Sequence, residues 1–497
     1  DAGRTSGVSS GSASPAENTG LQPPPRKPEA RDGDYGDGDG SNGFGDLLRP
    51  GTHRFRAFVA SAAGTMFEWY EFALFGAFAD IIGMHFFPAS DPAEALRYSF
   101  VLFFVGFLTR PLGAVVFGYV GDRYGRIPVL VWTAVLMLGP TLAMTLIPPY
   151  RQIGALSTLL LVVCRILQGL SLGGQAGSGI TFVLESVEPR HRAKMGSLFH
   201  ATGALGSLAA NLASGALRQS LSPEALHAWG WKVPFYAGVF LLIIGARLRT
   251  SLRETGPGAN GAKEGVGEGP TSPGQAAEQM RVRARRVGWL IVVSMLFMVF
   301  GFWAYVFVPA YLTSVREPPL RSAYTIAAVA QLSYCLSLLV FAYASDRLHL
   351  HHGRSRQLFL VGGALLSVVA FPAASYGLQH LDAWGCALAL TSVSVVHAIY
   401  GGSLPVYVFE HAGPLETRVS TISVLWALGA TAFGGTMPSI CEALSDAYDG
   451  LVAPSCYIAL AALASATAVV LGERALDPRS KLIVSRASFE HLVDEDD

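Results

Sequence analysis

Residues 107–126, FLTRPLGAVVFGYVGDRYGR, decide the fold of this chain, because they join an apolar helix to a charged turn. The apolar part carries one interior arginine, Arg110, and the turn contains Asp122, Arg123 and Arg126. A helix that crosses a bilayer tolerates an ionised side chain at depth only when a partner or a water-filled cavity compensates it. Arg110 is therefore a candidate functional residue, and the charged turn predicts the membrane surface.

The composition indicates a membrane protein. The chain is 51% hydrophobic and 14% charged, with a mean hydropathy of +0.39, which is too apolar for an ordinary soluble protein of 497 residues. The 36 Lys and Arg residues balance the 36 Asp and Glu residues, so the net charge does not indicate binding to nucleic acid. We expect a lipid bilayer around the chain and no nucleic-acid partner.

The five cysteines have no spacing typical of a metal site, so we expect neither zinc nor a disulfide framework, and no cofactor. Cys441 and Cys456 flank one predicted external loop and could pair in an oxidising compartment; two separate thiols are the alternative. His349, His351 and His352 lie in a basic loop, where solvated side chains explain them better than a metal does.

Apolar runs form two groups of six, and each run can cross a bilayer, which needs about 20 residues. Asp346-Arg347 stands in the second group where Asp122-Arg123 stands in the first, which indicates a degenerate repeat. The sequence therefore predicts an all-α polytopic membrane protein with twelve transmembrane helices in two pseudo-symmetric six-helix bundles. The expected segments are a disordered tail at 1–50, a bundle at 55–250, a cytoplasmic linker at 251–287, a bundle at 288–472 and a cytoplasmic tail at 473–497.

Basic residues gather in alternate loops. Arg49, Arg54 and Arg56 precede the first apolar run and an arginine cluster at 281–286 precedes the seventh, whereas the predicted external loop 441–452 has no Lys or Arg. Since loops rich in Lys and Arg stay in the cytoplasm, we expect both termini there. We expect a multi-pass protein of the plasma membrane.

Two acids, Glu68 and Glu71, lie inside the first apolar run, three residues apart and so on one helix face. Acids at this depth indicate proton or cation handling, because protonation removes the cost of a charge in hydrocarbon. Arg165 lies at a similar depth in the fourth run, and a carboxylate–guanidinium pair there could be made and broken by protonation. We predict proton coupling by Glu68, Glu71, Arg110 and Arg165; a static ion pair is the alternative.

Polar and aromatic side chains inside the spans are candidates for substrate binding, although packing explains many residues of this kind equally well. The predicted substrate-binding residues are Tyr70, Gln168, Gln175, Trp303, Gln331, His397 and Tyr400. Charged side chains at the cytoplasmic ends of the helices are candidates for gating. The predicted gating residues are Asp122, Arg123, Arg126, Glu185, Asp346, Arg347 and Arg418.

Three of these stretches resemble one known family. GYVGDRYGR at 118–126 closely resembles the signature between helices 2 and 3 of major facilitator superfamily transporters, and RILQG at 165–169 is similar to their helix 4 signature, where the arginine is associated with proton coupling. GTMFEWYEFALFG at 64–76 resembles the opening of their metabolite:proton symporter branch, which includes proline/betaine, ketoglutarate and shikimate-like transporters.

The resemblance implies proton-coupled symport of a small organic acid or zwitterion by alternating access, in a monomer that is not an enzyme. One departure is that Gln175 stands where this branch has an acid, and a glutamine cannot titrate. A uniporter of the same fold is therefore one alternative, and a membrane sensor without transport is another. Uptake that is unchanged by a protonophore would indicate the uniporter, and ligand binding without transport would indicate the sensor.

Overall fold

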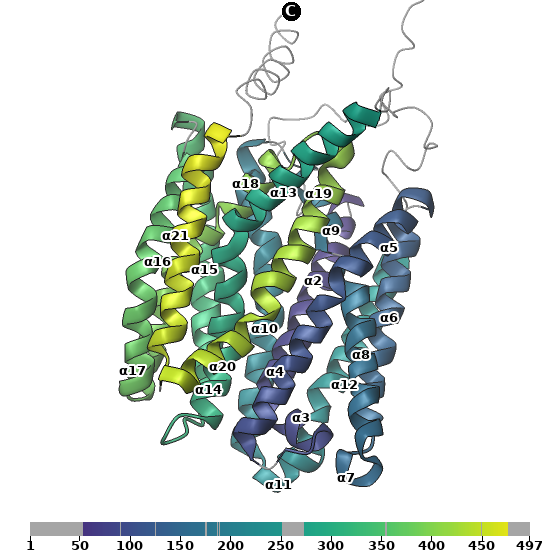
Figure 1. Ribbon diagram of the computed structural model, residues 1–497, viewed down its shortest axis with the longest axis vertical. Coiled ribbons are helices and arrows are strands. Elements are labelled where there is room, and N and C mark those ends of the chain that lie inside the picture. The colour runs from purple at the N-terminus through teal and green to yellow at the C-terminus, as the bar shows by residue number, and fades with distance from the viewer. Residues whose placement is uncertain are drawn as a thin grey trace, which may run out of the picture. The chain divides into compact units, whose positions relative to one another are not determined.

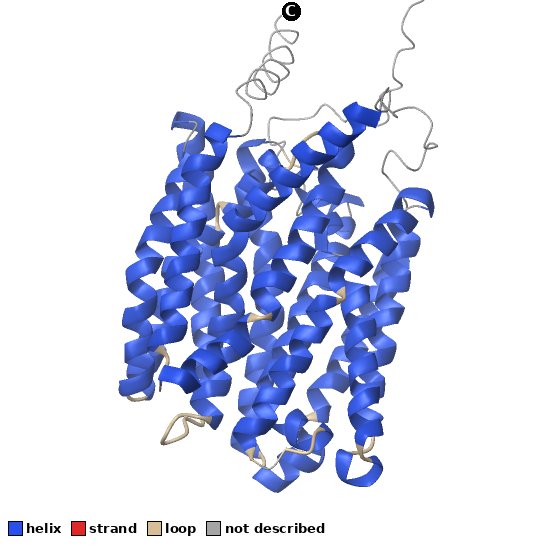
Figure 2. Ribbon diagram, viewed as in Figure 1, coloured by secondary structure: helices blue, strands red, loops and turns tan. Residues whose placement is uncertain are grey.

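The computed structural model describes residues 53–89, 91–124, 126–173, 176–185, 187, 189–250, 273–352, 355–448 and 450–475, and this part of the chain is helical without a strand (Figure 2). The predicted tail at 1–50, most of the tail at 473–497 and residues 251–272 of the predicted linker lie outside these ranges. Residues 273–287, expected in the linker, belong instead to a long helix that begins at Pro273.

Six spanning segments make up the first half, and several of them consist of two consecutive helices. They are α2 (His53–Ala77) with α3 (Ala79–Phe86), α4 (Pro92–Leu108) with α5 (Arg110–Tyr124), α6 (Arg126–Leu146), α8 (Ala155–Gly173) with α9 (Ala176–Glu185), α10 (Arg192–Ser220) and α12 (Lys232–Thr250). Short helices connect them: α7 (Tyr150–Ile153), η1 (Pro189–His191), α11 (Pro223–Ala225) and η2 (Leu226–Gly230).

The second half repeats this number of spans. Its segments are α13 (Pro273–Phe302), which continues through η3 (Trp303–Phe307) into α14 (Val308–Ser314); α15 (Ala323–His352); α16 (Ser355–His380); α17 (Ala383–Gly401) with α18 (Leu404–His411); α19 (Leu415–Gly429), which continues through η4 (Ala430–Gly435) into α20 (Met437–Tyr448); and α21 (Val452–Ala475). The predicted all-α fold of twelve transmembrane helices in two pseudo-symmetric bundles is confirmed. Figure 1 shows the helices side by side, with their long axes roughly parallel.

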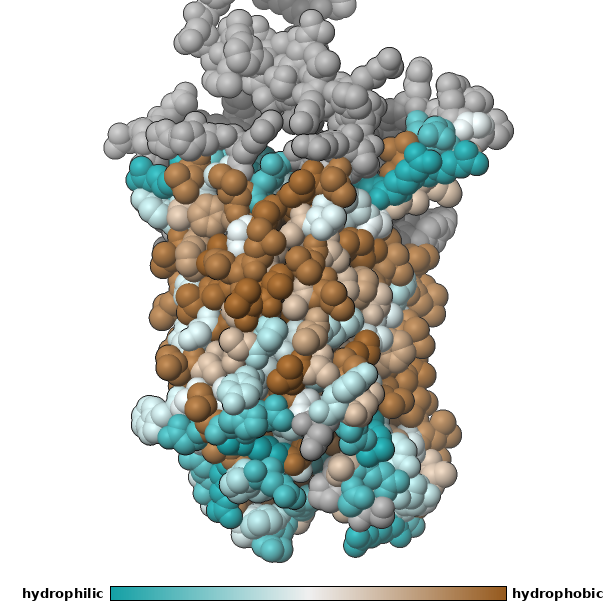
Figure 3. Space-filling model, turned by 60° about the vertical axis from the view of Figure 1, so that its left-hand side comes forward, coloured by the Kyte–Doolittle hydropathy of each residue, from teal (hydrophilic) through white to brown (hydrophobic). Residues whose placement is uncertain are grey.

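The surface of the helices suits a bilayer. Within the described residues, 8 helices are long and apolar enough to span a membrane by length and composition alone. In Figure 3, brown side chains form a belt between two teal ends. Large apolar side chains such as Leu112 and Val369 are exposed on the spanning helices. An apolar belt of this extent on the surface indicates contact with lipid.

The two halves pack together through α10 against α15, α9 against α19, and α4 against α20 and η4. Gly177 of α9 shows how close this approach is, since a Cβ there would overlap Ser423 of α19. Cys441 and Cys456 are both free thiols, so the possible disulfide between them is not formed.

Candidate functional site

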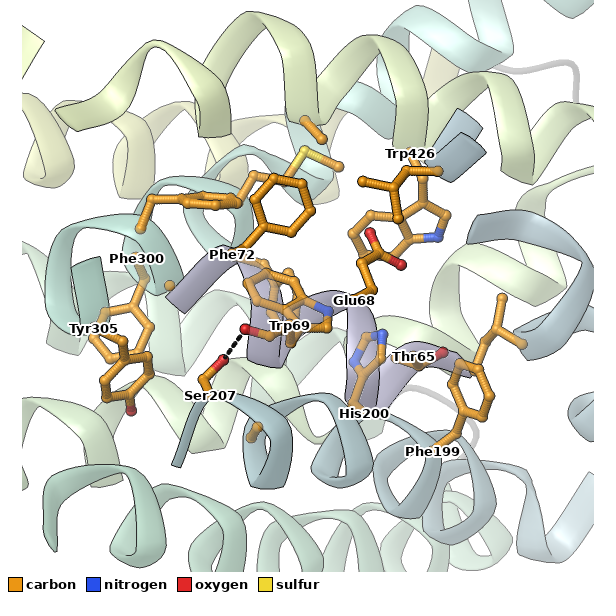
Figure 4. Close-up of a pocket in the computed structure, with 18 of the residues that line it drawn as sticks. Thr65, Glu68, Trp69, Phe72, Phe199, His200, Ser207, Phe300, Tyr305 and Trp426 are labelled. Atoms are coloured by element: carbon orange, nitrogen blue, oxygen red, sulfur yellow. Dashed lines mark hydrogen bonds between the residues drawn. The ribbon is translucent and has the colours of Figure 1, made fainter. Parts of the chain in front are cut away.

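A cavity lies between the two halves, at the level where α2 and α10 of the first half face α13, α17 and α19 of the second. Figure 4 shows Glu68, Trp69 and Phe72 of α2 around this space, with His200 of α10 and Trp426 of α19. Aromatic side chains are the largest group in its lining, beside aliphatic residues and a few polar groups. It includes Thr65, Glu68, Trp69, Phe72, Arg110, His200, Ser207, Phe297, Phe300, Tyr305, Gln331, Tyr334, His397 and Trp426.

An ion pair, which we call the cavity pair, faces this space. Arg110 Nη1 lies 3.3 Å from Glu68 Oε1, and their side chains are 9% and 10% exposed. The rings of Phe107 and Phe72 flank the guanidinium, whose Cζ lies 4.0 Å and 4.5 Å from their centroids. The cavity pair therefore presents one positive and one negative group to whatever occupies the cavity.

A second ion pair, which we call the inner pair, lies outside the cavity lining. Arg165 Nη2 lies 3.1 Å from Glu71 Oε1, and both side chains are 2% exposed. Arg165 Nη1 donates to Glu71 Oε2 at 3.3 Å, which makes the pair bidentate. Gln168 Nε2 donates to Glu71 Oε1 at 3.0 Å and lies 2.8 Å from Thr141 Oγ1. The inner pair is thus desolvated, and its carboxylate accepts hydrogen bonds from two side chains of α8.

Asp346 joins the halves at one end of the bundle. Its carboxylate accepts hydrogen bonds from the backbone N–H groups of Ala193 at 3.2 Å and Lys194 at 3.0 Å, at the start of α10. A carboxylate is favourable at this position because a helix N-terminus carries partial positive charge. Arg356 of the second half lies 3.7 Å from Asp346 and also pairs with Glu410. The Asp346 carboxylate is therefore stabilised both by Arg356 and by the N–H groups of α10.

Other contacts join the halves on the far side of the cavity. Arg97 Nε at the start of α4 lies 3.1 Å from Glu442 Oε1 of α20, and Arg97 Nη2 lies 3.8 Å from Asp446. Nearer the cavity, Thr431 Oγ1 donates to the Phe107 carbonyl oxygen at 2.7 Å. The Phe107 carbonyl oxygen is available to Thr431 because Pro111, four residues later in the helix, has no N–H to donate to it. Contacts between the halves therefore lie on both sides of the cavity.

A sequence profile described as Major Facilitator Superfamily matches residues 57–435. The chain belongs to this superfamily. It is a membrane transporter of the major facilitator type, and the resemblance found in its sequence is confirmed.

Relatives and solved structures agree with this assignment. The proline/betaine transporter of Escherichia coli (strain K12) is 28% identical over 436 residues, covering 85% of this chain and 84% of that protein. A Staphylococcus haemolyticus (strain JCSC1435) relative is 29% identical over 408 residues, covering 80% of this chain and 83% of its own. The xylose transporter XylE from E. coli, in a partially occluded inward open conformation, matches with a TM-score of 0.64 over 84% of this chain and 97% of that one; at 14% identity this shows a shared fold alone.

Two of the substrate-binding candidates line the cavity of the transporter. Gln331 contributes its amide, whose Oε1 accepts a hydrogen bond from Asn211 Nδ2 at 3.1 Å. His397 contributes an imidazole that stacks on Phe300 with 3.9 Å between the ring centroids. The part these two residues play stays a prediction.

The other candidates lie elsewhere. Tyr70 donates to the Pro234 carbonyl oxygen at 2.8 Å, and Tyr400 donates to the Val293 carbonyl oxygen, so both hydroxyls are held by backbone. Trp303 is fully buried, with its ring against Phe371. Gln168 donates to Glu71 of the inner pair, and Gln175 lies outside the described residues. Helical spacing alone could not separate these packing positions from those that face the cavity.

Of the gating candidates, one contacts the other half of the protein and two donate hydrogen bonds within their own half. Asp346 joins the halves, whereas Arg347 Nε donates to Tyr343 Oη at 2.9 Å and Arg418 Nε donates to the Gly413 carbonyl oxygen at 3.2 Å, both within the second half. The backbones of four further candidates belong to α5, α6 and α9, but their side chains lie outside the described part of the structure. These candidates are Asp122, Arg123, Arg126 and Glu185.

The sequence analysis missed most of the aromatic lining, including Trp69, His200 and Trp426. No signal in the sequence separates them, because 28 Phe, 17 Tyr and 8 Trp are spread through the chain. The sequence also gives no direct sign of the contact between Arg97 and Glu442, which lie far apart in the chain. The absence of Lys and Arg from 441–452, in a loop that contains acids, was the one available indication of a partner elsewhere.

Proposed function

We propose that this transporter carries a small zwitterion together with a proton, by alternating access between its two halves. The observation that carries the proposal is the cavity pair, because it presents opposite charges inside an aromatic enclosure. Of the small organic acids and zwitterions that the sequence predicts as substrates, a zwitterion fits both charges of the pair. A dicarboxylate would place a second negative charge near Glu68.

The recognition chemistry follows from the two members of the cavity pair. The substrate carboxylate binds the Arg110 guanidinium, which can offer parallel N–H donors to two carboxylate oxygens. The cationic nitrogen lies toward Glu68 and against aromatic faces such as those of Trp69 and Trp426, which attract cations through their negative ring faces. The name of the E. coli relative, a proline/betaine transporter, supports a substrate of this class.

The inner pair carries the proton in this proposal. Protonation of Glu71 would neutralise one member of a buried pair and leave Arg165 without its counter-charge, which is unfavourable in a site that is 2% exposed. The protonated state therefore favours a different arrangement of α2 and α8. Because Glu68 and Glu71 lie one turn apart on α2, movement of this helix links the inner pair to the cavity pair.

Alternating access would open the contacts at one end while those at the other stay closed. We place the Asp346 contact on the cytoplasmic side, since Arg190, Arg192 and Lys194 precede or begin α10 there. The Arg97 contact then lies on the external side, both termini are cytoplasmic, and the protein works as a monomer in the plasma membrane.

Uptake into proteoliposomes tests this function. We expect an inward pH gradient to drive accumulation of proline and glycine betaine, with little uptake of succinate or xylose. A protonophore should abolish accumulation but leave equilibration. Uphill uptake of succinate alone would overturn the substrate assignment, and uptake that ignores the protonophore would show a uniporter.

A further inference from the structure

His397 combines complete burial with unsatisfied hydrogen bonding at the cavity wall. Its side chain, on α17, is 0% exposed and lines the cavity. Neither Nδ1 nor Nε2 hydrogen bonds to a protein atom. Two other polar groups of the lining are bonded within the protein, because Tyr305 Oη donates to Ser394 at 3.2 Å and Gln331 Oε1 accepts from Asn211, whereas His200 Nδ1 also has no hydrogen bond.

The surroundings fix the ring of His397 without using its nitrogens. Phe300 stacks on it at 3.9 Å between centroids and 26° between planes, and Tyr334 lies 5.8 Å away at 24°. Phe300 covers one face of the imidazole, whereas Tyr334 lies toward the ring edge, because the Phe300 and Tyr334 centroids are only 6.1 Å apart. The stack therefore orients the ring and leaves one donor and one acceptor of the neutral imidazole unused.

A buried donor or acceptor without a partner costs about 1–3 kcal/mol. At a packed position this cost would be permanent, but at a cavity wall a substrate can remove it. A site built around such a group discriminates strongly against an analogue that lacks the matching polar group, because binding that analogue leaves the site unsatisfied.

We propose that His397 is a specificity residue that selects zwitterions bearing a hydroxyl or carbonyl group at the end away from the charged head. The inference rests on the proposed function, in which the charged head binds the cavity pair. The cavity pair belongs to the first half and His397 to the second, so a substrate that contacts both spans the boundary between the halves. The Gln331 amide lines the same wall and offers a second polar group to the distal substituent.

Matched substrates that differ by a hydroxyl test this inference. Proline and 4-hydroxyproline form one pair, and glycine betaine and carnitine form another in which the hydroxyl sits on a longer chain. We expect the wild-type protein in proteoliposomes to favour the hydroxylated member of at least one pair by tenfold or more in kcat/KM. His397→Phe keeps the ring stack and should bring this ratio to about one, through loss of the hydroxylated substrate. His397→Gln, which keeps a donor and an acceptor, should retain part of the preference.

Ser207→Ala provides the control, because Ser207 also lines the cavity but its hydroxyl donates to the Trp69 carbonyl oxygen at 3.4 Å. This variant should leave the ratio unchanged. Equal kcat/KM for both members of both pairs in the wild type, or an unchanged ratio in His397→Phe, would overturn the role of His397 while zwitterion transport stood. If none of the four zwitterions were transported, the proposed function itself would fall, and this inference with it.

Discussion

Replacement of Glu71 by glutamine should separate proton coupling from substrate movement. Glutamine keeps the shape of the protonated carboxyl and can still accept from Gln168, whose Nε2 lies 3.0 Å from Glu71 Oε1, but it cannot release a proton. With the membrane potential held at zero, a gradient of one pH unit supplies about 1.36 kcal/mol per proton, which corresponds to about tenfold accumulation. We expect this ratio to fall to one in Glu71→Gln, while exchange of labelled for unlabelled substrate continues.

The same substitution has a calculable effect on stability. It leaves the Arg165 guanidinium without a counter-charge at a position 2% exposed, and loss of one partner from a buried pair costs about 3–5 kcal/mol. The double variant Glu71→Gln/Arg165→Gln removes both charges and should recover most of this loss in thermal unfolding of the purified protein. A double-variant Tm as low as that of Glu71→Gln would contradict the ion-pair reasoning.

Proteoliposomes with an imposed pH gradient provide the assay, and Glu278→Gln provides the control. Glu278 is an acid of α13 whose side chain is 61% exposed, so its loss should change neither accumulation nor exchange. Tenfold accumulation by Glu71→Gln under the same gradient would refute the assignment of the proton to the inner pair. Loss of exchange together with accumulation would instead show that Glu71 is needed for substrate movement itself.

Two further substitutions test the contacts at the ends of the cavity. Asp346→Asn weakens the acceptor for the Ala193 and Lys194 N–H groups. Ser197 can report on this contact, because its hydroxyl donates to the Gly402 carbonyl oxygen of the other half at 3.0 Å. In the Asp346→Asn protein, a cysteine at position 197 should react about tenfold faster with a cytoplasmic thiol reagent, and an unchanged rate would exclude this contact as a gate. Arg97→Gln should have a small effect on transport, below about fivefold, because the Arg97 side chain is 53% exposed and such pairs contribute about 0.2–1 kcal/mol. Abolished transport in Arg97→Gln would show a larger role than its exposure allows.

The spans could be predicted because a bilayer permits few solutions. In hydrocarbon the backbone polar groups must hydrogen bond within the segment, so long apolar runs form helices. Basic residues recur in alternate loops, and this alternation gives an independent test of the number of spans. The helical structure of residues 273–287 could not be predicted in this way, because arginines and a polar start are typical of a linker as well as of a cytoplasmic helix extension. Helix ends outside the apolar run carry no hydropathy signal.

The candidate site was only partly predictable, and the two acids of α2 show why. The sequence alone placed Glu68, Glu71, Arg110 and Arg165 within the spans, because a charge inside an apolar run is visible without coordinates. It left open which acid meets which arginine. Residues three apart on a helix point about 60° from each other, and only the arrangement of neighbouring helices decides what each one meets.

The sequence by itself determined that this chain is a twelve-helix membrane protein of the major facilitator type, with ionisable groups at depth. The tertiary structure decided that Glu68 pairs with Arg110 beside the cavity while Glu71 pairs with Arg165 outside its lining. It also decided that His397 faces the cavity while Tyr70 and Trp303 pack away from it. The physical reason is that hydropathy is a property of each segment alone, whereas exposure to a cavity depends on helices that are distant in the chain.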